Sequence, residues 1–126
     1  MMKGIKPIVL AIAAAFILKL LFFDFIIAQG QSMEPVIKNG SILIVSRLSY
    51  GIRLPWLQKY LVRWSQPKAG DVVVFYTPTG ELAVKRCVFT EDNKFYAEGD
   101  NGLASYDSRS YGPVPIENII GKVLGY

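Results

Sequence analysis

The stretch that decides the fold is DVVVFYTPTGELAVKRCVF, residues 71–89. It contains two runs rich in Val and Phe, 71–76 and 81–89, on either side of the turn residues TPTG (77–80). Branched and aromatic residues on both sides of a Pro- and Gly-containing turn predict a β-hairpin.

Strand alternation gives the run 81–89 two faces that are both largely apolar. One face carries Lys85 between small or apolar neighbours, namely Ala83, Cys87 and Phe89. A lysine in such surroundings is unusual, because its charged amine loses hydration when it is buried. The ordinary alternative is a lysine that protects a strand edge from aggregation.

Further strands are predicted at 41–48, 94–98 and 119–126, each after turn residues or paired through a short turn. No helical pattern longer than two turns follows residue 30. With 126 residues there is room for one compact domain. We expect a mostly β fold, built as an antiparallel β-sandwich or a partly open barrel.

The composition excludes several chemistries. The chain has no histidine and a single cysteine, Cys87, so it can form neither an intrachain disulfide nor a zinc site of the Cys/His type. Ser-His-Asp and Cys-His catalysis are excluded as well. We expect no metal and no cofactor. The net charge of +4 is mild, and we expect no nucleic-acid partner.

The N-terminal segment 7–28 is apolar except for Lys19 and Asp24. As a helix it is long enough to cross a bilayer, and Lys3 and Lys6 before it favour a cytoplasmic N-terminus. We expect residues 1–28 to be a cytoplasmic stub and membrane anchor, with a strand after the membrane exit near 20–24. A cleaved signal peptide is the alternative, and a buried helix is a third.

Residues 47–68 combine basic and aromatic side chains and contain no acidic residue. This mixture suits a membrane interface, where Trp and Tyr lie at headgroup level and cations meet anionic lipids. It suits equally a loop or short helix that packs its aromatic rings onto the sheet. Both interpretations stay open at this point.

Ser32, in QSMEP (31–35), is a candidate nucleophile. A serine hydroxyl needs a base, and without histidine the remaining candidate at neutral pH is lysine. An ordinary lysine has a pKa of about 10.4, so the base must be desolvated or placed near another cation. Lys85 meets that demand best.

The polar stretch EGDNGLASYDSRSYGPVP (98–115) has the composition of a long surface loop. Within it Asp107 and Arg109 could pair, and Asp100 could pair with Arg86, the neighbour of the proposed base. Such ion pairs would support a site rigidly, although an ordinary loop is the more common explanation.

Three separated motifs resemble the sequence boxes of bacterial type I signal peptidases, which are Ser-Lys membrane proteases. They are QSMEP, VKRCV (84–88) and GDNGLASYDSRSYGPV (99–114). GDVVVF (70–75), FFDFIIAQGQSM (22–33) and YGIRLP (50–55) are similar to family sequences too. The matches follow one another in the family's order and cover most of the chain.

The resemblance implies removal of signal peptides from exported preproteins at the outer, periplasmic face of the cytoplasmic membrane, by a single-pass protein. Ser32 would attack the carbonyl after a small residue, with its own N–H in the oxyanion hole, and Lys85 would be the general base. Ser105 would orient the lysine by a hydrogen bond. Asp107 and Arg109 would be structural. The residues from 29 to 126 would then form the catalytic domain.

The chain departs from the family at two places. Gly30 stands where some members carry a second serine that aids the oxyanion hole. Only residues 86–98 separate Lys85 from Gly99, so the usual extension after the lysine is missing. This shortening favours a specialised maturation peptidase for one substrate, such as a pilin-processing enzyme. Two further interpretations are a self-cleaving repressor, which uses the same Ser-Lys chemistry, and a catalytically silent membrane-anchored assembly module.

Overall fold

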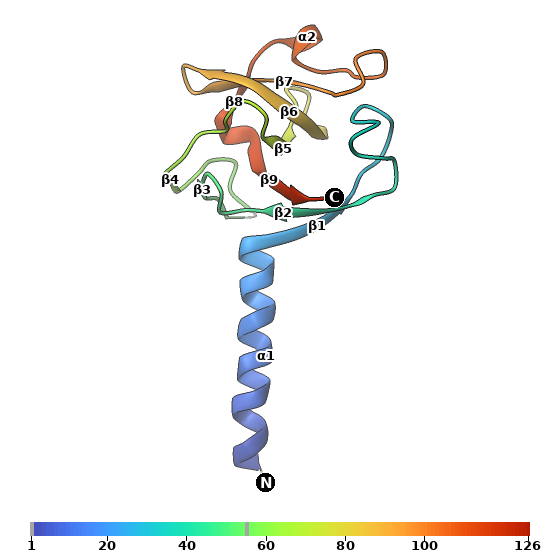
Figure 1. Ribbon diagram of the computed structural model, residues 1–126. Helices are drawn as coiled ribbons and strands as arrows, with labels where there is room; N and C mark the ends of the chain where they lie inside the picture. The colour runs from blue at the N-terminus through green and yellow to red at the C-terminus, as the bar shows by residue number, and fades with distance from the viewer. Residues whose placement is uncertain (1, 55) are drawn as a thin grey trace.

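The computed structural model describes residues 2–54 and 56–126, and it gives no side-chain description for residues 2, 3, 20 and 21. It begins with a long helix, α1 (Met2–Phe22), which projects from the rest of the chain (Figure 1). Within the described ranges, no helix combines the length and the hydropathy required of a membrane span. The transmembrane helix expected from the sequence is therefore not confirmed.

The remainder of the chain is mostly β, as predicted. One antiparallel sheet contains seven strands in the order β1 (Phe23–Ile27), β2 (Ile42–Ser46), β9 (Ile119–Gly125), β5 (Val72–Tyr76), β6 (Leu82–Glu91), β7 (Lys94–Glu98) and β8 (Val114–Pro115). The sheet curls into a half-barrel rather than a two-sheet sandwich, with β1 and β2 at the end of α1 and β6 and β7 on the far side (Figure 1). A short helix, α2 (Ser108–Tyr111), and a 3₁₀ turn (Ile116–Asn118) precede β9.

Each predicted strand, including the one predicted after residues 20–24, forms where its apolar run lies. The last run, 119–126, forms a central strand, because β9 lies between β2 and β5. Its Gly121 allows this central position, since a Cβ there would clash with the Ser46 carbonyl oxygen of the neighbouring strand.

The core lies on both faces of the sheet. Alternate residues of β5 enter two different clusters, so the apolar run 72–75 is buried throughout. The first cluster contains Tyr50, Val73, Phe75, Cys87, Phe95, Ala97, Val114, Ile116 and Ile119. The second contains Met33, Ile37, Leu43, Val45, Val72, Val74, Ile120 and Val123.

Strand β6 is twice as long as its neighbours and pairs with them over different halves. It pairs with β5 from Leu82 to Arg86 and with β7 only from Arg86 onward. Among the described residues, the other edge of β6 over 82–85 therefore has no strand partner. A bulge after Cys87 turns Phe89 away from the face predicted for it, and Phe89 is exposed and stacks on Tyr96.

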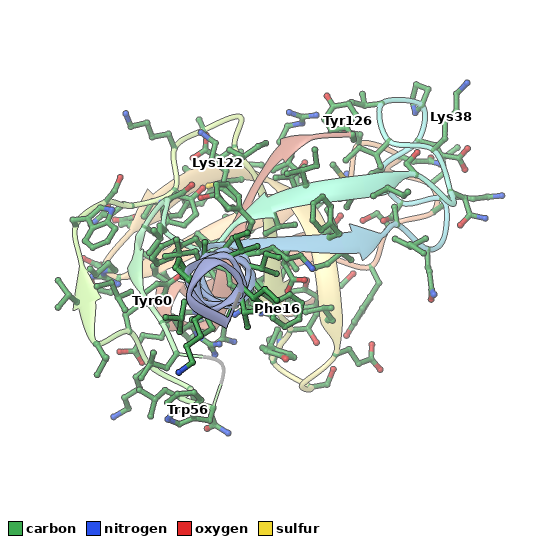
Figure 2. The ribbon with its side chains drawn as sticks, turned by 90° about the horizontal axis from the view of Figure 1, so that it is seen from below. Phe16, Lys38, Trp56, Tyr60, Lys122 and Tyr126 are labelled. Atoms are coloured by element: carbon green, nitrogen blue, oxygen red, sulfur yellow. The ribbon has the colours of Figure 1, made fainter. Side chains whose placement is uncertain are left out.

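Part of the segment 47–68 packs its aromatic rings onto the sheet, and contact of the rest with lipid stays a prediction. It forms a two-stranded sheet of β3 (Gly51–Ile52) and β4 (Val62–Arg63). Tyr50 is buried in the first cluster, and the Tyr60 hydroxyl donates to the Ile119 carbonyl at 2.7 Å. Trp56 and Trp64 are exposed, and Trp56 projects at the margin of the domain in the view along α1 (Figure 2). Residue 55 lies outside the described residues.

Candidate active site

The pocket that contains Ser32 and Lys85 lies between two strand edges. Strand β1 ends the sheet on one side, and the residues after it face the half of β6 that β7 does not cover. The pocket has a volume of about 510 Å³. Its lining comes from residues 26–30, 32, 33 and 37 on one side, and 77, 81–85 and 106 on the other. The curled sheet thus brings together the serine, the lysine and Gly30.

The turn that carries Ser32 is held by backbone contacts on both sides. Gly30 has a φ of +89°, which glycine adopts without strain, and its N–H donates to the Asn39 side chain at 3.0 Å. The Ser32 carbonyl accepts from the Asn101 N–H at 2.8 Å, and the Asn101 amide donates to the Gln31 carbonyl at 3.1 Å. Asn101 was not singled out in the sequence, and these contacts assign it to the support of the serine turn.

Lys85 is 7% exposed, in a strand position that the hairpin fixes. It lies opposite Val73 of β5, so its side chain emerges on the face of the first cluster, between Ala83 and Cys87. Burial lowers the pKa of the Lys85 amine, while the negative charge of Asp107 raises it and the positive charge of Arg109 lowers it again. Because these two charges oppose each other, desolvation decides the direction.

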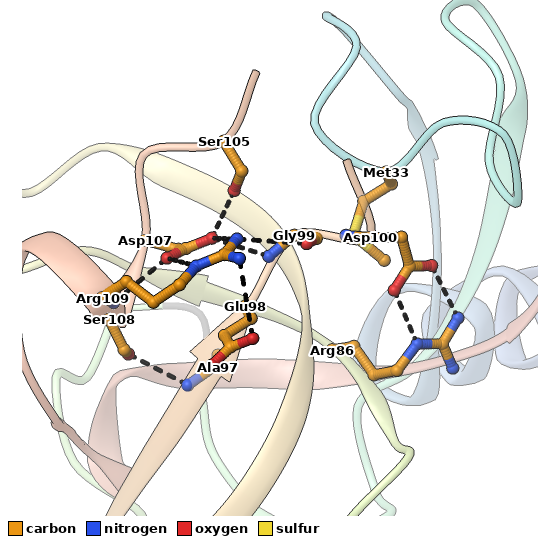
Figure 3. A network of polar contacts seen from close by, with 10 residues as sticks. All are labelled: Met33, Arg86, Ala97, Glu98, Gly99, Asp100, Ser105, Asp107, Ser108 and Arg109. Carbon is orange, nitrogen blue, oxygen red and sulfur yellow. Dashed lines mark hydrogen bonds and ion pairs between the residues drawn. The ribbon is translucent and has the colours of Figure 1, made fainter. Parts of the chain in front are cut away.

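Asp107 is fully buried and is the centre of the polar network beside the pocket (Figure 3). Its carboxylate accepts hydrogen bonds from the Ser105 hydroxyl at 2.5 Å, from the Gly99 N–H at 2.8 Å and from the Arg109 guanidinium at 2.6 and 3.0 Å. Burial by itself raises the pKa of this carboxyl, but the hydrogen bonds from Arg109, Ser105 and the backbone hold it well below the usual range. Asp107 therefore stays ionised over the working pH range.

The Asp107–Arg109 pair expected from the sequence is thus present. Hydrogen bonding to Asp107 raises the pKa of the Arg109 guanidinium, which also contacts Glu98 at 3.7 Å. The Ser105 hydroxyl donates its one hydrogen bond to Asp107. Toward Lys85 its oxygen could therefore only accept a hydrogen bond. Among the described residues no hydrogen bond joins Ser105 to Lys85, and its expected role as the residue that orients the lysine stays a prediction.

The second expected pair, Arg86 with Asp100, is bidentate, with distances of 2.9 and 2.8 Å (Figure 3). Hydrogen bonding to Asp100 raises the pKa of Arg86, whose third nitrogen donates to the Gly70 carbonyl at 3.0 Å. The Asp100 N–H points at the sulfur of Met33 at 3.4 Å. The ion pair therefore ties the strand of Lys85 to the loop at Asp100, and the backbone N–H groups of Asp100 and Asn101 contact the turn of Ser32.

Gly99 is a further residue that the sequence did not single out. A Cβ at this position would clash with the Ser105 hydroxyl oxygen and would lie 2.6 Å from the Ser32 carbonyl oxygen. The loop that carries Ser105 and the turn that carries Ser32 approach each other through the space that the missing side chain leaves. The only sequence signal was a glycine in a loop, which by itself is ambiguous.

We therefore expect Gly99→Ala to disturb both serines together. The clash should lower the free energy of unfolding by about 2 kcal/mol, as overpacking does, and should reduce any activity of the site. Urea unfolding of the two proteins measures the first effect. Gly125→Ala is the matched control, because a Cβ there meets nothing within 4 Å. A Gly99→Ala protein as stable as the parent would contradict the close approach.

The fold and the pocket define a β-rich protein with a buried lysine and a serine in one cleft. The family model described as signal peptidase, peptidase S26, matches residues 1–90 and 90–125. The chain belongs to this family.

Curated relatives extend the comparison. The chain is 30% identical to signal peptidase I of Haemophilus influenzae, over 88% of this chain and 31% of that protein. It is 33% identical to mitochondrial inner membrane protease subunit 1 of Xenopus tropicalis, over 79% of this chain and 66% of that protein. It is 26% identical to signal peptidase I of Bacillus caldolyticus, over 93% of this chain and 86% of that protein. The chain thus spans less than two thirds of the length of the first two relatives.

Proposed function

We propose that the chain is a serine endopeptidase that removes signal peptides from exported preproteins, with Ser32 as nucleophile and Lys85 as general base. The observation that carries the proposal is that both side chains line one pocket in which burial lowers the pKa of the lysine. The family and the names of the relatives support the substrate class. The proposed reaction uses no metal and no cofactor.

In the first half of the reaction, the neutral amine of Lys85 takes the proton of the Ser32 hydroxyl while the oxygen attacks the scissile carbonyl carbon. The carbonyl oxygen becomes an oxyanion that the Ser32 N–H stabilises. Gly30 provides no side-chain donor there, so a second donor comes from another group in the pocket. The ammonium of Lys85 then gives its proton to the departing amine, and the acyl group stays on Ser32.

In the second half, Lys85 takes a proton from water, and the resulting nucleophile attacks the ester carbonyl. Collapse of the tetrahedral intermediate breaks the bond to the Ser32 oxygen, which recovers its proton from Lys85. Asp107 stays ionised throughout and holds Arg109 and Ser105 in place. Arg86 and Asp100 keep the strand and the serine turn in register.

Two strand edges at the pocket, which pair with no other strand among the described residues, suggest how the substrate binds. An extended peptide can add to the free edge of β6 over 82–85 or to the outer edge of β1, since exposed strand edges offer backbone hydrogen bonds. Several of the side chains that line the pocket are small or apolar, including Ala28, Ala83 and Met33. This lining is consistent with cleavage after small residues.

The direct test is to incubate the detergent-solubilised full chain with a preprotein and to determine the N-terminus of the product by mass spectrometry. We expect one cut after a small residue at the end of the signal peptide. A preprotein that stays intact at enzyme concentrations in excess of substrate would contradict the proposal.

We also propose that the protein is held at the cytoplasmic membrane through α1, with the domain on the outer face. The apolar side chains of α1 are exposed along its length, for example Leu10 and Phe16. An exposed apolar row on β1 and β2 continues from the helix and contains Phe23, Phe25, Ile27, Ile42 and Ile44. The aromatic side chains of 47–68 that stay exposed would meet the lipid headgroups.

The two tryptophans of the chain, Trp56 and Trp64, both lie in 47–68 and are both more than half exposed. Their fluorescence therefore reports on this segment alone. In proteoliposomes of anionic lipid, we expect lipids brominated near the headgroup to quench the emission strongly. Lipids brominated at the chain ends are the matched control and should quench less. Emission that neither lipid changes would show that the segment does not contact the bilayer.

A further inference from the structure

Tyr106 lies in the pocket wall next to the network, between Ser105 and Asp107. It is the one described residue of the loop 99–107 that lines the pocket, and its side chain is 62% exposed. Both of its neighbours are held by the 2.5 Å bond from Ser105 to Asp107. The backbone of Tyr106 is therefore fixed, although its ring faces solvent.

The ring of Tyr106 is held as well. It packs edge-on against the ring of Tyr111, with centroids 5.2 Å apart and planes at 69°. Tyr111 is the last residue of α2 and packs against the first core cluster. Burial raises the pKa of its hydroxyl to about 12, so the supporting ring stays neutral. Tyr106 thus has one side of its ring supported by a residue of the core, while the rest of the ring is exposed beside the pocket.

The pairing of β6 limits where a substrate can lie on its edge. A peptide on the free edge of β6 can extend along 82–85 but not past Arg86, because β7 occupies the edge from there on. The chain leaves β7 after Glu98 and enters the loop 99–107. For such a peptide, the proposed orientation places the acyl portion against the apolar residues from 26 to 28 and 82 to 84 and turns the leaving portion toward this loop, where Tyr106 lines the pocket.

We propose that Tyr106 is a specificity-determining residue that limits the size of the first substrate residue after the scissile bond. The inference rests on the proposed peptidase function and adds a restriction on the leaving side of the substrate. Large side chains at that position would meet the ring of Tyr106, whereas alanine or serine would pass beneath it. Tyr106 takes no part in the proton transfers.

The test compares kcat/KM for two preproteins that differ only in the residue after the cut, alanine or leucine. We expect the parent to prefer alanine by at least about tenfold, and Tyr106→Ala to reduce this preference to about threefold or less. Tyr106→Phe should keep the parental ratio, because the ring remains. Leu103→Ala, a change at a fully exposed residue of the same loop, is the matched control and should leave the ratio unchanged.

A second pair of preproteins, with alanine or valine before the cut, should show the same preference in the parent and in Tyr106→Ala. A Tyr106→Ala enzyme that discriminates between alanine and leucine after the cut with the parental ratio would overturn the inference while the proposed function stands. A parent that cleaves neither preprotein would overturn both.

Discussion

Ser32→Ala is expected to lower the rate of preprotein cleavage by about 10⁴-fold or more, because the acyl-enzyme can no longer form. The serine turn is held by backbone contacts of Gly30, Gln31 and Asn101, and none of these involves the Ser32 hydroxyl. The variant should therefore keep the fold and its free energy of unfolding. Cleavage measured by gel shift and stability measured in urea separate the two properties.

The matched control for this variant is Ser110→Ala, since Ser110 is an exposed serine near the same network and does not line the pocket. It should cleave at the parental rate. If Ser32→Ala retained more than about a tenth of the parental rate, Ser32 could not be the nucleophile.

Lys85→Met is expected to lower cleavage by about 10³-fold or more and, at the same time, to stabilise the fold. Methionine fills a similar volume without a charge that must be desolvated, so the free energy of unfolding at neutral pH should rise by about 1 kcal/mol. A loss of activity accompanied by a gain in stability distinguishes a functional lysine from a structural one. Thermal and urea unfolding measure the gain.

The pH dependence of stability gives this prediction a second readout. The pKa of Lys85 is lower in the folded chain than in the unfolded chain, so the unfolded state binds more protons between the folded pKa and about 10.4. The stability of the parent therefore rises with pH across this window, and Lys85→Met should lose that contribution. Lys94→Met, at an exposed position, is the control. A destabilised Lys85→Met protein with unchanged pH dependence would contradict a desolvated amine.

Much of the fold was predictable because strand formation here follows local sequence. The runs 41–48, 71–76 and 94–98 are branched or aromatic and end at turn residues, and each forms a strand. Strand alternation was also sufficient to single out Lys85. It failed for Phe89, since a bulge after Cys87 depends on pairing with β7 that the strand's own sequence does not specify.

The parts of the site that escaped prediction depend on contacts between distant segments. Gly99 matters because Ser105 and Ser32 both lie close to the position that a Cβ would occupy, and Asn101 matters because it donates to the serine turn. The Ser105 hydroxyl donates its hydrogen bond to Asp107, and the folded geometry decides that Asp107 is the acceptor.

The sequence also did not show which aromatic side chains of the segment 47–68 enter the core and which stay on the surface, because this too depends on distant contacts. Tyr50 and Tyr60 find polar partners inside the domain, Asp71 and a backbone carbonyl, and both partners lie far from them in the sequence. The tryptophans of the segment have no such partner among the described residues and stay exposed. Composition alone could not separate the two groups of rings.

The central claim, that a desolvated lysine activates the serine, is tested most directly by the pH dependence of kcat/KM for cleavage of one preprotein. Only the neutral amine can act as base, so kcat/KM should rise with pH and reach half of its plateau below about 10.4, the value of an ordinary lysine. A flat profile between about pH 6 and 9 would contradict Lys85 as the base.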